Sequence, residues 1–248
     1  MGINELAGRA FSRRLVAGVG TVAAAVASLL LTAAPPASAD ACPAVEVVFA
    51  RGTGEPVGVG RVGQGLVDAL RPLIGNKSIA VDAVDYPASH DFLRATDGAN
   101  DASVRVQNIT ATCPNTKIVL GGYSQGAAVV DLVTSDGQPL FGYANPMPAG
   151  MANHIAAVAV FGNPANRIGG PSPVANPLYA DKTIDLCNGA DPVCSPGGDV
   201  AAHRIYVEAG LADQAAHFIA QRLSGGAPQA SAVISSASAT DPSALPTP

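Results

Sequence analysis

The residues with the most specific chemistry are Gly122-Tyr123-Ser124-Gln125-Gly126, which match the pattern G-x-S-x-G. They follow a short apolar run typical of a buried strand, and a helical pattern begins directly after the serine. A serine on such a strand-to-helix turn has a strained backbone that lifts its hydroxyl above the sheet, and the flanking glycines leave room for the turn. N–H groups at the start of the helix face negative charge that develops there. The pattern therefore favours a nucleophilic Ser124 over an ordinary glycine-rich turn.

A nucleophilic serine needs a base, and the chain has four histidines: His90, His154, His203 and His217. Around this kind of serine turn the chain order is serine, acid, histidine, which excludes His90. His154 opens a strand pattern with no acid in the residues directly before it, so we expect a polar surface role. His217 lies inside a helical pattern, where a structural role fits better. His203 follows the last strand pattern in a loop from which a base can reach the edge of the sheet, so we favour His203.

The acid is sought among three aspartates between this serine and this histidine: Asp185, Asp191 and Asp199. Asp191 lies in a turn-rich segment between two cysteines, and a carboxylate braced in this way suits the task of fixing an imidazole tautomer. Asp185 falls inside a strand pattern, where its side chain would be buried in the sheet. Asp199 is only four residues from His203, which is short for a loop that must fold back. We therefore expect Asp191 to be the acid, while the alternative of a turn aspartate before Pro192 stays open.

The two ends of the chain differ from a folded domain in composition. Residues 1–14 carry three arginines and one glutamate, residues 15–31 contain no charge, and residues 37–39 read Ala-Ser-Ala. These features describe a secretory signal peptide, so we expect residues 1–39 to be removed on export. The alternative, a membrane anchor, is disfavoured because the apolar stretch is short for a bilayer and prolines follow it. Residues 224–248 contain one charge and no regular period, which is typical of a flexible tail.

The chain contains four cysteines: Cys42, Cys113, Cys187 and Cys194. An even number in an exported chain indicates disulfides. No C-x-x-C pair or histidine partner suits zinc, so we predict no metal site. A local bridge between Cys187 and Cys194 would close a turn-rich segment, and by elimination Cys42 would pair with Cys113. In the chain-entropy model that longer loop stabilises the fold by about 4 kcal/mol.

Between the two ends, residues 40–223 alternate short apolar runs with helical patterns. The expected strands are 45–50, 79–86, 117–122, 154–162 and 183–187. The expected helices are 62–74, 101–113, 125–134 and 211–223. This alternation predicts a single α/β domain with a central parallel sheet covered by helices on both faces. The Gly- and Pro-rich stretch 163–182 is expected to be a loop, so no segment remains for a helical lid.

Composition limits the classes of partner. The chain has 248 residues, of which 48% are hydrophobic and only 13% are charged, and its formal net charge is -5. A disordered chain needs the opposite balance of charge and apolar content. An acidic chain without a basic block also offers no electrostatic footprint for nucleic acid or for an anionic membrane surface. We therefore expect neither as a partner.

Several segments together carry a resemblance to a known family: Val48–Thr53 (VFARGT), Tyr86–Ala88 (YPA), Gly121–Gly126 (GGYSQG), Phe161–Pro164 (FGNP), Cys187–Cys194 (CNGADPVC) and Ala202–Tyr206 (AHRIY). In this order, with both cysteine pairs in register, they resemble the cutinase family of serine esterases. The similarity is greatest to its secreted actinobacterial members, and it spans residues 42–223.

This resemblance implies a small lidless α/β-hydrolase with the disulfides Cys42–Cys113 and Cys187–Cys194. It also implies a catalytic triad and an oxyanion hole. The triad would consist of Ser124, Asp191 and His203, and the oxyanion hole of Thr53 and the backbone N–H of Gln125. The stretches 57–65 and 163–180 would border the groove for the acyl chain.

We therefore expect a secreted, monomeric serine esterase that hydrolyses small-molecule or lipid esters of short to medium acyl chain, with polyesters among the candidate substrates. It would need no metal or organic cofactor, and it would have no membrane span after the signal peptide is removed. Two alternatives stay open. One is a phospholipase or an esterase of mycolate-type glycolipids in the cell envelope. The other is a catalytically weak secreted protein that binds the envelope and keeps the serine turn as a relic.

Overall fold

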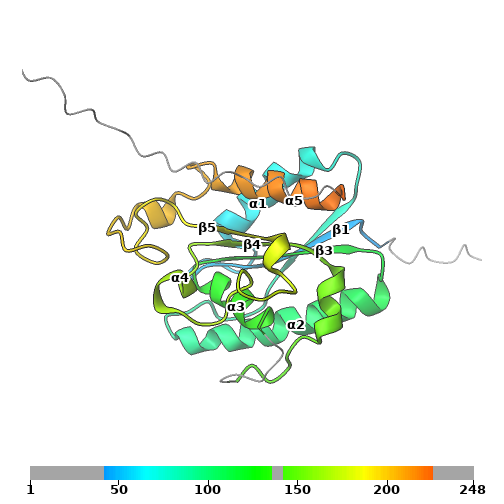
Figure 1. The fold of residues 1–248 in the computed structure, drawn as a ribbon, viewed down its shortest axis with the longest axis horizontal. Helices are drawn as coiled ribbons and strands as arrows, with labels where there is room; N and C mark the ends of the chain where they lie inside the picture. The colour runs from blue at the N-terminus through cyan, green and yellow to red at the C-terminus, as the bar shows by residue number, and fades with distance from the viewer. Residues whose placement is uncertain (1–41, 136–141, 226–248) are drawn as a thin grey trace, which may run out of the picture. The chain divides into compact units, whose positions relative to one another are not determined.

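A computed structural model describes residues 42–135 and 142–225 (Figure 1). The predicted signal peptide, and all but the first two residues of the predicted tail, lie outside these ranges. The described residues contain a five-stranded sheet in the order β2-β1-β3-β4-β5, and every strand pairing is parallel. Its strands are β1 Val45–Ala50, β2 Ile79–Ala83, β3 Lys117–Tyr123, β4 Ile155–Phe161 and β5 Thr183–Leu186. The expected parallel α/β architecture is confirmed.

The strand order reverses between β1 and β3. From β1 the chain first moves to β2 at one edge, and it then returns to β3 and continues outward to β4 and β5. In open parallel sheets, ligands bind in the crevice outside the carboxyl ends of the strands at such a switch point. The segments that leave β1 and β3 contain Thr53 and Ser124, so the topology alone brings these two residues to one crevice.

Helices cover both faces of the sheet (Figure 1). On one face lie α1 Gly60–Leu73 and α5 Leu211–Leu223, and on the other lie α2 Ala95–Thr112 and α3 Gln125–Val133. Side chains alternate between the two faces along each strand. Val119 therefore packs with the α1 and α5 side, whereas Ile118 and Leu120 pack with the α2 and α3 side. Because both faces are covered, the strands are nearly continuous apolar runs.

Helix α2 begins six residues earlier than predicted, at Ala95 instead of residue 101. Its first turns bury small residues rather than large apolar ones. A Cβ on Gly98 would lie 2.9 Å from Val129 Cγ2 and 3.0 Å from Tyr86 Cγ, so this turn packs closely against its neighbours. Small residues produce a weak hydrophobic period, which explains why the pattern of residues missed the start of the helix.

Strand β2 ends at Ala83, three residues before its predicted end. The buried guanidinium of Arg51 donates hydrogen bonds to the carbonyl of Val84 at 3.5 Å and to that of Tyr86 at 2.7 Å. The side chain of Arg51, which follows β1, therefore binds carbonyl groups that would pair with a neighbouring strand if β2 were longer.

The stretch 163–182 is not only a loop, as predicted, because α4 Ala165–Ile168 lies within it. Asn163 Oδ1 accepts the Ala165 N–H at 2.9 Å and so satisfies a donor at the start of this helix. A single turn of helix is too short to form a separate lid.

Both expected disulfides are present, with Cα–Cα distances of 5.5 Å for Cys42–Cys113 and 5.7 Å for Cys187–Cys194. The first connects the start of the described chain to the end of α2, and the second closes the loop after β5. Within residues 42–135 and 142–225, no helix is both long and apolar enough to cross a bilayer.

Candidate active site

Ser124 occupies a sharp turn between β3 and α3. Its φ of 57° lies in the left-handed region that non-glycine residues rarely adopt. Two glycines make the turn possible: a Cβ on Gly122 would lie 2.1 Å from the Gly126 carbonyl oxygen, and a Cβ on Gly126 would lie 2.0 Å from that of Ala50. The Ser124 N–H donates to the Phe161 carbonyl at 2.8 Å, which fixes the turn to β4. The backbone geometry is that predicted for a nucleophile elbow.

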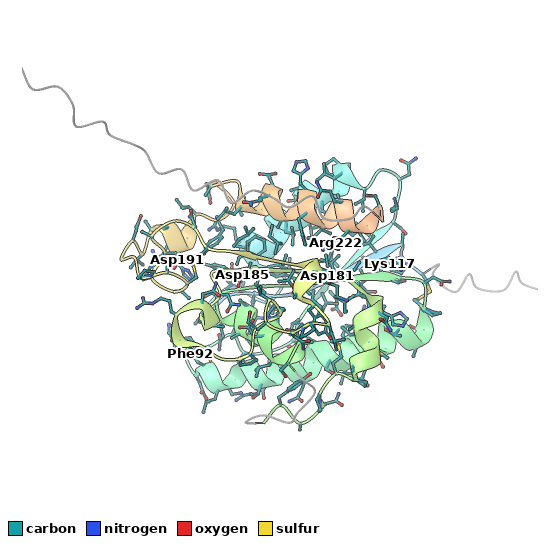
Figure 2. The ribbon with its side chains drawn as sticks, in the orientation of Figure 1. Phe92, Lys117, Asp181, Asp185, Asp191 and Arg222 are labelled. Atoms are coloured by element: carbon teal, nitrogen blue, oxygen red, sulfur yellow. A yellow bond between two sulfur atoms is a disulfide. The ribbon has the colours of Figure 1, made fainter. Side chains whose placement is uncertain are left out.

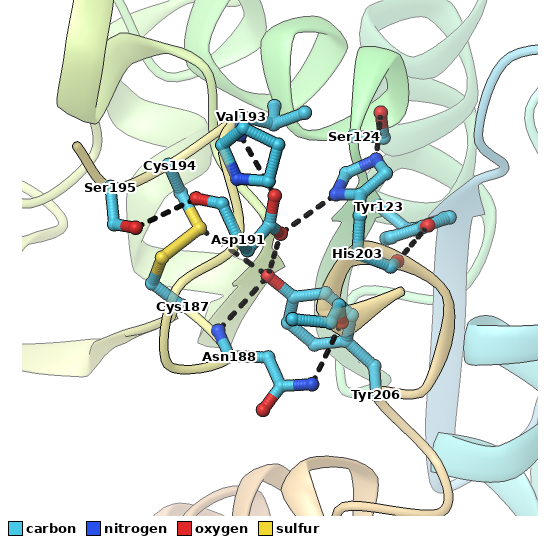
Figure 3. Close-up of polar contacts among 12 residues, drawn as sticks. Tyr123, Ser124, Cys187, Asn188, Asp191, Val193, Cys194, Ser195, His203 and Tyr206 are labelled. Atoms are coloured by element: carbon cyan, nitrogen blue, oxygen red, sulfur yellow. Dashed lines mark hydrogen bonds and ion pairs between the residues drawn. A yellow bond between two sulfur atoms is a disulfide. The ribbon is translucent and has the colours of Figure 1, made fainter. Parts of the chain in front are cut away.

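The structure brings Ser124, His203 and Asp191 into one hydrogen-bonded row (Figure 3). His203 Nε2 lies 2.9 Å from Ser124 Oγ, and His203 Nδ1 lies 2.7 Å from Asp191 Oδ2. The Asp191 side chain is fully buried, and the His203 side chain is 17% exposed. With its Nδ1 proton held by the carboxylate, the imidazole presents Nε2 to the serine hydroxyl as a proton acceptor.

Asp191 is held by donors besides His203. The Val193 N–H donates to its Oδ1 at 2.8 Å, and the Tyr206 hydroxyl donates to its Oδ2 at 2.6 Å (Figure 3). The Cys187–Cys194 disulfide closes the loop that carries it. A buried carboxylate needs such donors to offset the loss of water, and together they leave it one orientation.

Tyr206 joins this group of contacts, although the sequence interpretation did not single it out. It is fully buried, and it is the third residue after His203, in a segment that had been noted only as part of the family resemblance. A Cβ on Gly162, whose φ is 58°, would lie 3.0 Å from both His203 Cε1 and the Tyr206 hydroxyl. Only glycine therefore fits where β4 ends beside this pair. The available signal was a tyrosine three residues after the predicted base.

The ring of Tyr123 supports the imidazole from another side. It stacks on His203 with ring centroids 5.0 Å apart and an angle of 29° between the planes. The Tyr123 hydroxyl also donates to the His203 backbone carbonyl. Tyr123 directly precedes Ser124, so the residue that ends β3 contacts His203 while its neighbour presents its hydroxyl to the same imidazole.

The other candidate residues do not join this row. His90 is exposed on the wall of the cleft described below, and His217 is exposed on α5 instead of being packed in the core. His154 is half-buried at the end of the short helix η2 Ala149–His154. Asp199 is exposed, and Asp185 is half-buried rather than enclosed in the sheet. In the part of the chain that the structure describes, no group of three or more His, Cys, Asp or Glu side chains is arranged to hold a metal ion.

Thr53 and Gln125 lie together beside the serine. Thr53 Oγ1 is 3.1 Å from Gln125 Oε1, and the Gln125 side chain is buried. The Gln125 N–H is the first of α3, and helix geometry leaves it without an intrahelical acceptor. No other described residue accepts it. The N-terminus of α3 therefore offers a free donor next to Ser124 Oγ.

A cleft of about 680 Å³ opens over these residues and is lined mostly by apolar side chains. One face of α3 forms its floor with Ser124, Ala128 and Leu132. The rim includes Phe92 and Leu93 beside the start of α2 (Figure 2) and Ile168 on α4, which are 63%, 73% and 83% exposed. Residues from the stretch 163–180 line the cleft as expected, whereas none from 57–65 does.

Two carboxyl groups, the buried Asp131 and the half-buried Asp185, share one hydrogen-bond donor near the cleft. Asp131, on the cleft wall, accepts a hydrogen bond from Asn163 Nδ2 at 3.0 Å, and the same amide nitrogen donates to Asp185 Oδ2 at 3.4 Å. Burial raises the pKa of Asp131 to about 8 and the pKa of Asp185 to about 6, since a buried carboxylate loses its hydration. Asp131 is therefore largely protonated at neutral pH.

Comparison with known proteins identifies relatives over nearly the whole described chain. The Cutinase family model matches residues 41–223. Phospholipase Culp4 of Mycobacterium tuberculosis is 52% identical, over 87% of this chain and 95% of that protein. Carboxylesterase Culp1 of the same species is 47% identical, over 85% of this chain and 97% of that protein.

Solved structures agree with this assignment. Trichoderma reesei cutinase, in complex with a phosphonate inhibitor, is 36% identical with a TM-score of 0.60, over 73% of this chain and 77% of that one. The catalytic core domain of acetyl xylan esterase from Trichoderma reesei is 27% identical with a TM-score of 0.61, over 73% of this chain and 99% of that one. The match of the family model to most of the chain, with relatives about half identical over almost their entire length, shows that this chain belongs to the cutinase family and is a carboxylic ester hydrolase.

Proposed function

We propose that the chain hydrolyses esters by acyl transfer to Ser124, with His203 as general base and Asp191 as the residue that orients it. The observation that supports this assignment is the pair of contacts at His203, 2.9 Å to Ser124 Oγ and 2.7 Å to Asp191 Oδ2, with Ser124 lining an apolar cleft. A hydroxyl from the turn after β3 and two side chains from the connection between β5 and α5 are thus in the hydrogen-bond contact that nucleophilic catalysis requires.

In the proposed mechanism, Ser124 Oγ attacks the ester carbonyl carbon while His203 Nε2 takes the hydroxyl proton. The carbonyl electrons move to the oxygen, and this oxyanion accepts hydrogen bonds from the Thr53 hydroxyl and the Gln125 N–H. Collapse of the adduct breaks the bond to the alcohol, which leaves with the proton from His203. Water then attacks the acyl-enzyme by the same sequence of proton transfers, which releases the acid and restores Ser124.

The cleft supports esters with short to medium acyl chains as substrates. Its walls are mostly apolar, so an acyl chain would exclude water from them on binding. Its rim carries apolar side chains that are exposed to solvent, so the alcohol part of the substrate can extend outward past them. Lipids and polyesters, whose ester bonds lie at or near a surface, are therefore within the proposed substrate range.

A phospholipase activity is the second candidate, because the 52% identical relative is named Phospholipase Culp4. The two activities share one acyl-transfer mechanism and differ in the alcohol that leaves. A series of p-nitrophenyl esters from acetyl to palmitoyl, run beside phosphatidylcholine vesicles, separates them. Higher kcat/KM on the short and medium esters than on vesicles supports the esterase, and the reverse supports the phospholipase.

We also propose that residues 1–39 direct export and are removed, so that the secreted protein is a hydrolase domain over residues 40–223 followed by the tail 224–248. The two disulfides support an oxidising compartment. The net charge of -5 supports a protein without a nucleic-acid partner, and we expect a monomer. Intact mass of the protein from culture medium should give Asp40 as the first residue, and light scattering should give the mass of one chain.

The catalytic assignment is tested with Ser124→Ala. It should lower ester turnover on the order of 10⁴-fold or more and abolish labelling by a fluorophosphonate. Ser224→Ala is the matched control, because Ser224 follows the end of α5 and does not line the cleft. A folded wild type that neither reacts with the fluorophosphonate nor hydrolyses any of the esters would contradict the proposal, and so would full activity of Ser124→Ala.

A further inference from the structure

The side chain of Gln125 contacts the Thr53 hydroxyl, whose proton the proposed mechanism needs for the oxyanion. Gln125 Oε1 lies 3.1 Å from Thr53 Oγ1, and a carbonyl oxygen has no proton to donate. The hydrogen bond must therefore be donated by Thr53. A threonine hydroxyl has only one proton, so in this arrangement it is directed at the amide and not at the position of an oxyanion. The Gln125 N–H is then the remaining donor.

The other end of the same amide lacks a partner. Gln125 is only 4% exposed, and its Nε2 forms no hydrogen bond with any residue in the described ranges. A buried N–H without an acceptor is costly and rare in native proteins, whereas a carbonyl that lacks a donor is tolerated more often. The amide as it stands thus has its acceptor satisfied and its donors unsatisfied.

A half-turn of the amide about its last side-chain bond exchanges Oε1 and Nε2 without changing the space that the side chain fills. Nε2 then donates to Thr53 Oγ1, so the buried N–H gains an acceptor. The Thr53 oxygen now accepts, and its hydroxyl proton is free to point at the substrate. One rotation therefore satisfies a buried donor and completes the oxyanion hole.

The surroundings hold the backbone of both partners in place. The close approach of Gly126 to the Ala50 carbonyl fixes the start of α3 against the end of β1. The loop that carries Thr53 is held by Arg51 Nε, which donates to the Glu55 carbonyl at 3.0 Å, and by Glu55 Oε2, which accepts the Gly52 N–H at 2.6 Å. Because the backbone of Gln125 and of the Thr53 loop is held, the side-chain amide of Gln125 is the group of this pair that can rotate.

We propose that Gln125 is a positioning residue whose side-chain amide orients the Thr53 hydroxyl toward the oxyanion, through a hydrogen bond from Nε2 to Oγ1. This inference rests on the proposed function, because it concerns the oxyanion of ester hydrolysis. It differs from the role of the Gln125 backbone N–H, which would touch the oxyanion directly.

The test compares Gln125→Glu with Gln125→Met. If Gln125 only fills space, Gln125→Glu should be the milder substitution, because it keeps the shape of the side chain. If Gln125 orients Thr53, Gln125→Met should be the milder one. Gln125→Glu keeps the shape of the side chain, but a carboxylate can only accept, so it holds the Thr53 proton away from the oxyanion. Gln125→Met cannot donate and is only a weak acceptor, so the hydroxyl is free to find the oxyanion. We expect kcat for p-nitrophenyl butyrate to fall about 10²-fold in Gln125→Glu and less than about 10-fold in Gln125→Met, with KM changed by less than about 3-fold in both. The reverse order of the two losses would overturn the inference.

A double-mutant cycle with Thr53→Val separates orientation of the hydroxyl from direct repulsion between the new carboxylate and the oxyanion. Thr53→Val removes the hydroxyl and should itself lower kcat about 10²–10³-fold. Adding Gln125→Glu to it should cause no further loss, because no hydroxyl remains to orient. If the two losses multiply, Gln125 acts independently of Thr53 and the inference fails.

Two controls keep these outcomes separable. If Gln125→Glu does not fold, as judged by its melting curve, the same cycle with Gln125→Met applies: its loss should vanish in the Thr53→Val background, and a loss that persists overturns the inference. Wild-type turnover and fluorophosphonate labelling are measured first. A wild type without either overturns the proposed function as well, whereas an active wild type with multiplying losses overturns the orienting role alone.

Discussion

Asp131 makes a pH dependence of stability predictable from the structure. Its side chain is 3% exposed, and its Oδ1 accepts a hydrogen bond from Asn163. Asp131→Asn removes the ionisable group but keeps an oxygen at Oδ1 for that bond. The substitution therefore isolates the effect of the charge from the effect of the hydrogen bond.

The sign follows from the raised pKa. Burial raises the pKa of Asp131 from 3.8 to about 8, so between these values the folded state binds more protons than the unfolded state. The free energy of unfolding of the wild type then falls as pH rises, by up to about 1.4 kcal/mol per pH unit from this one group. From about pH 5 to about pH 7 the variant should gain about 2–3 kcal/mol relative to the wild type. For a domain of this size that gain raises the relative Tm by about 4–12 °C.

Urea denaturation at several pH values, followed by circular dichroism, measures the difference between the two proteins. Asp185→Asn is the matched control, because burial raises the pKa of Asp185 only to about 6. Its advantage should therefore stop growing near that pH, while the advantage of Asp131→Asn should grow up to about pH 8. A difference between wild type and Asp131→Asn that stays constant over this pH range would refute the reasoning.

Three further predictions concern separate parts of the fold. Tyr206→Phe should lower the free energy of unfolding by about 1.5–3 kcal/mol in urea denaturation, because it removes a donor from the buried carboxylate of Asp191; a change below about 0.5 kcal/mol would contradict this. Cys42→Ser with Cys113→Ser should lower the same quantity by about 4 kcal/mol, because the bridge spans 71 residues, with kcat unchanged since neither residue lines the cleft; unaltered stability would refute it. Ala128→Phe should fill the cleft floor and lower kcat/KM for palmitoyl relative to acetyl esters by about 10-fold or more, and an equal loss on both esters would show that the acyl chain does not follow this floor.

Local patterns predicted the sheet and most of its helices because both faces of the sheet are covered. Strands such as β1 and β4 are unbroken apolar runs, and the turn at Ser124 is marked by glycines that no other residue could replace. The order of serine, acid and histidine excluded His90, while the cysteine-closed segment favoured Asp191 and the loop after the last strand favoured His203; the structure brings these two residues into contact with each other. These features depend on neighbours in sequence or on chain order, which a sequence displays.

Contacts between distant side chains were not predictable in the same way. Asn163 and Asp131 are 32 residues apart, and the tyrosine that binds Asp191 is 15 residues from it. An aspartate within the apolar helix α3 was a visible signal of an unusual environment, but nothing local identifies its partner. The start of α2 was missed for a different reason: its buried residues are alanine and glycine, so packing there depends on small size and not on a hydrophobic period.

The site residues that follow β1 and β3 and those that follow β5 are held in place by different kinds of contact. Ser124 and Thr53 follow β3 and β1, which are paired neighbours, so close backbone packing between Gly126 and Ala50 sets their distance. Asp191 and His203 follow β5 at the edge of the sheet, where no further strand within residues 42–135 and 142–225 confines them. The Cys187–Cys194 disulfide, the buried Tyr206 and the stacked ring of Tyr123 hold these two residues in place instead. The proposed nucleophile and oxyanion donors are therefore positioned by the backbone of the core, whereas the proposed base and its acid depend on side-chain contacts such as those of Tyr206 and Tyr123.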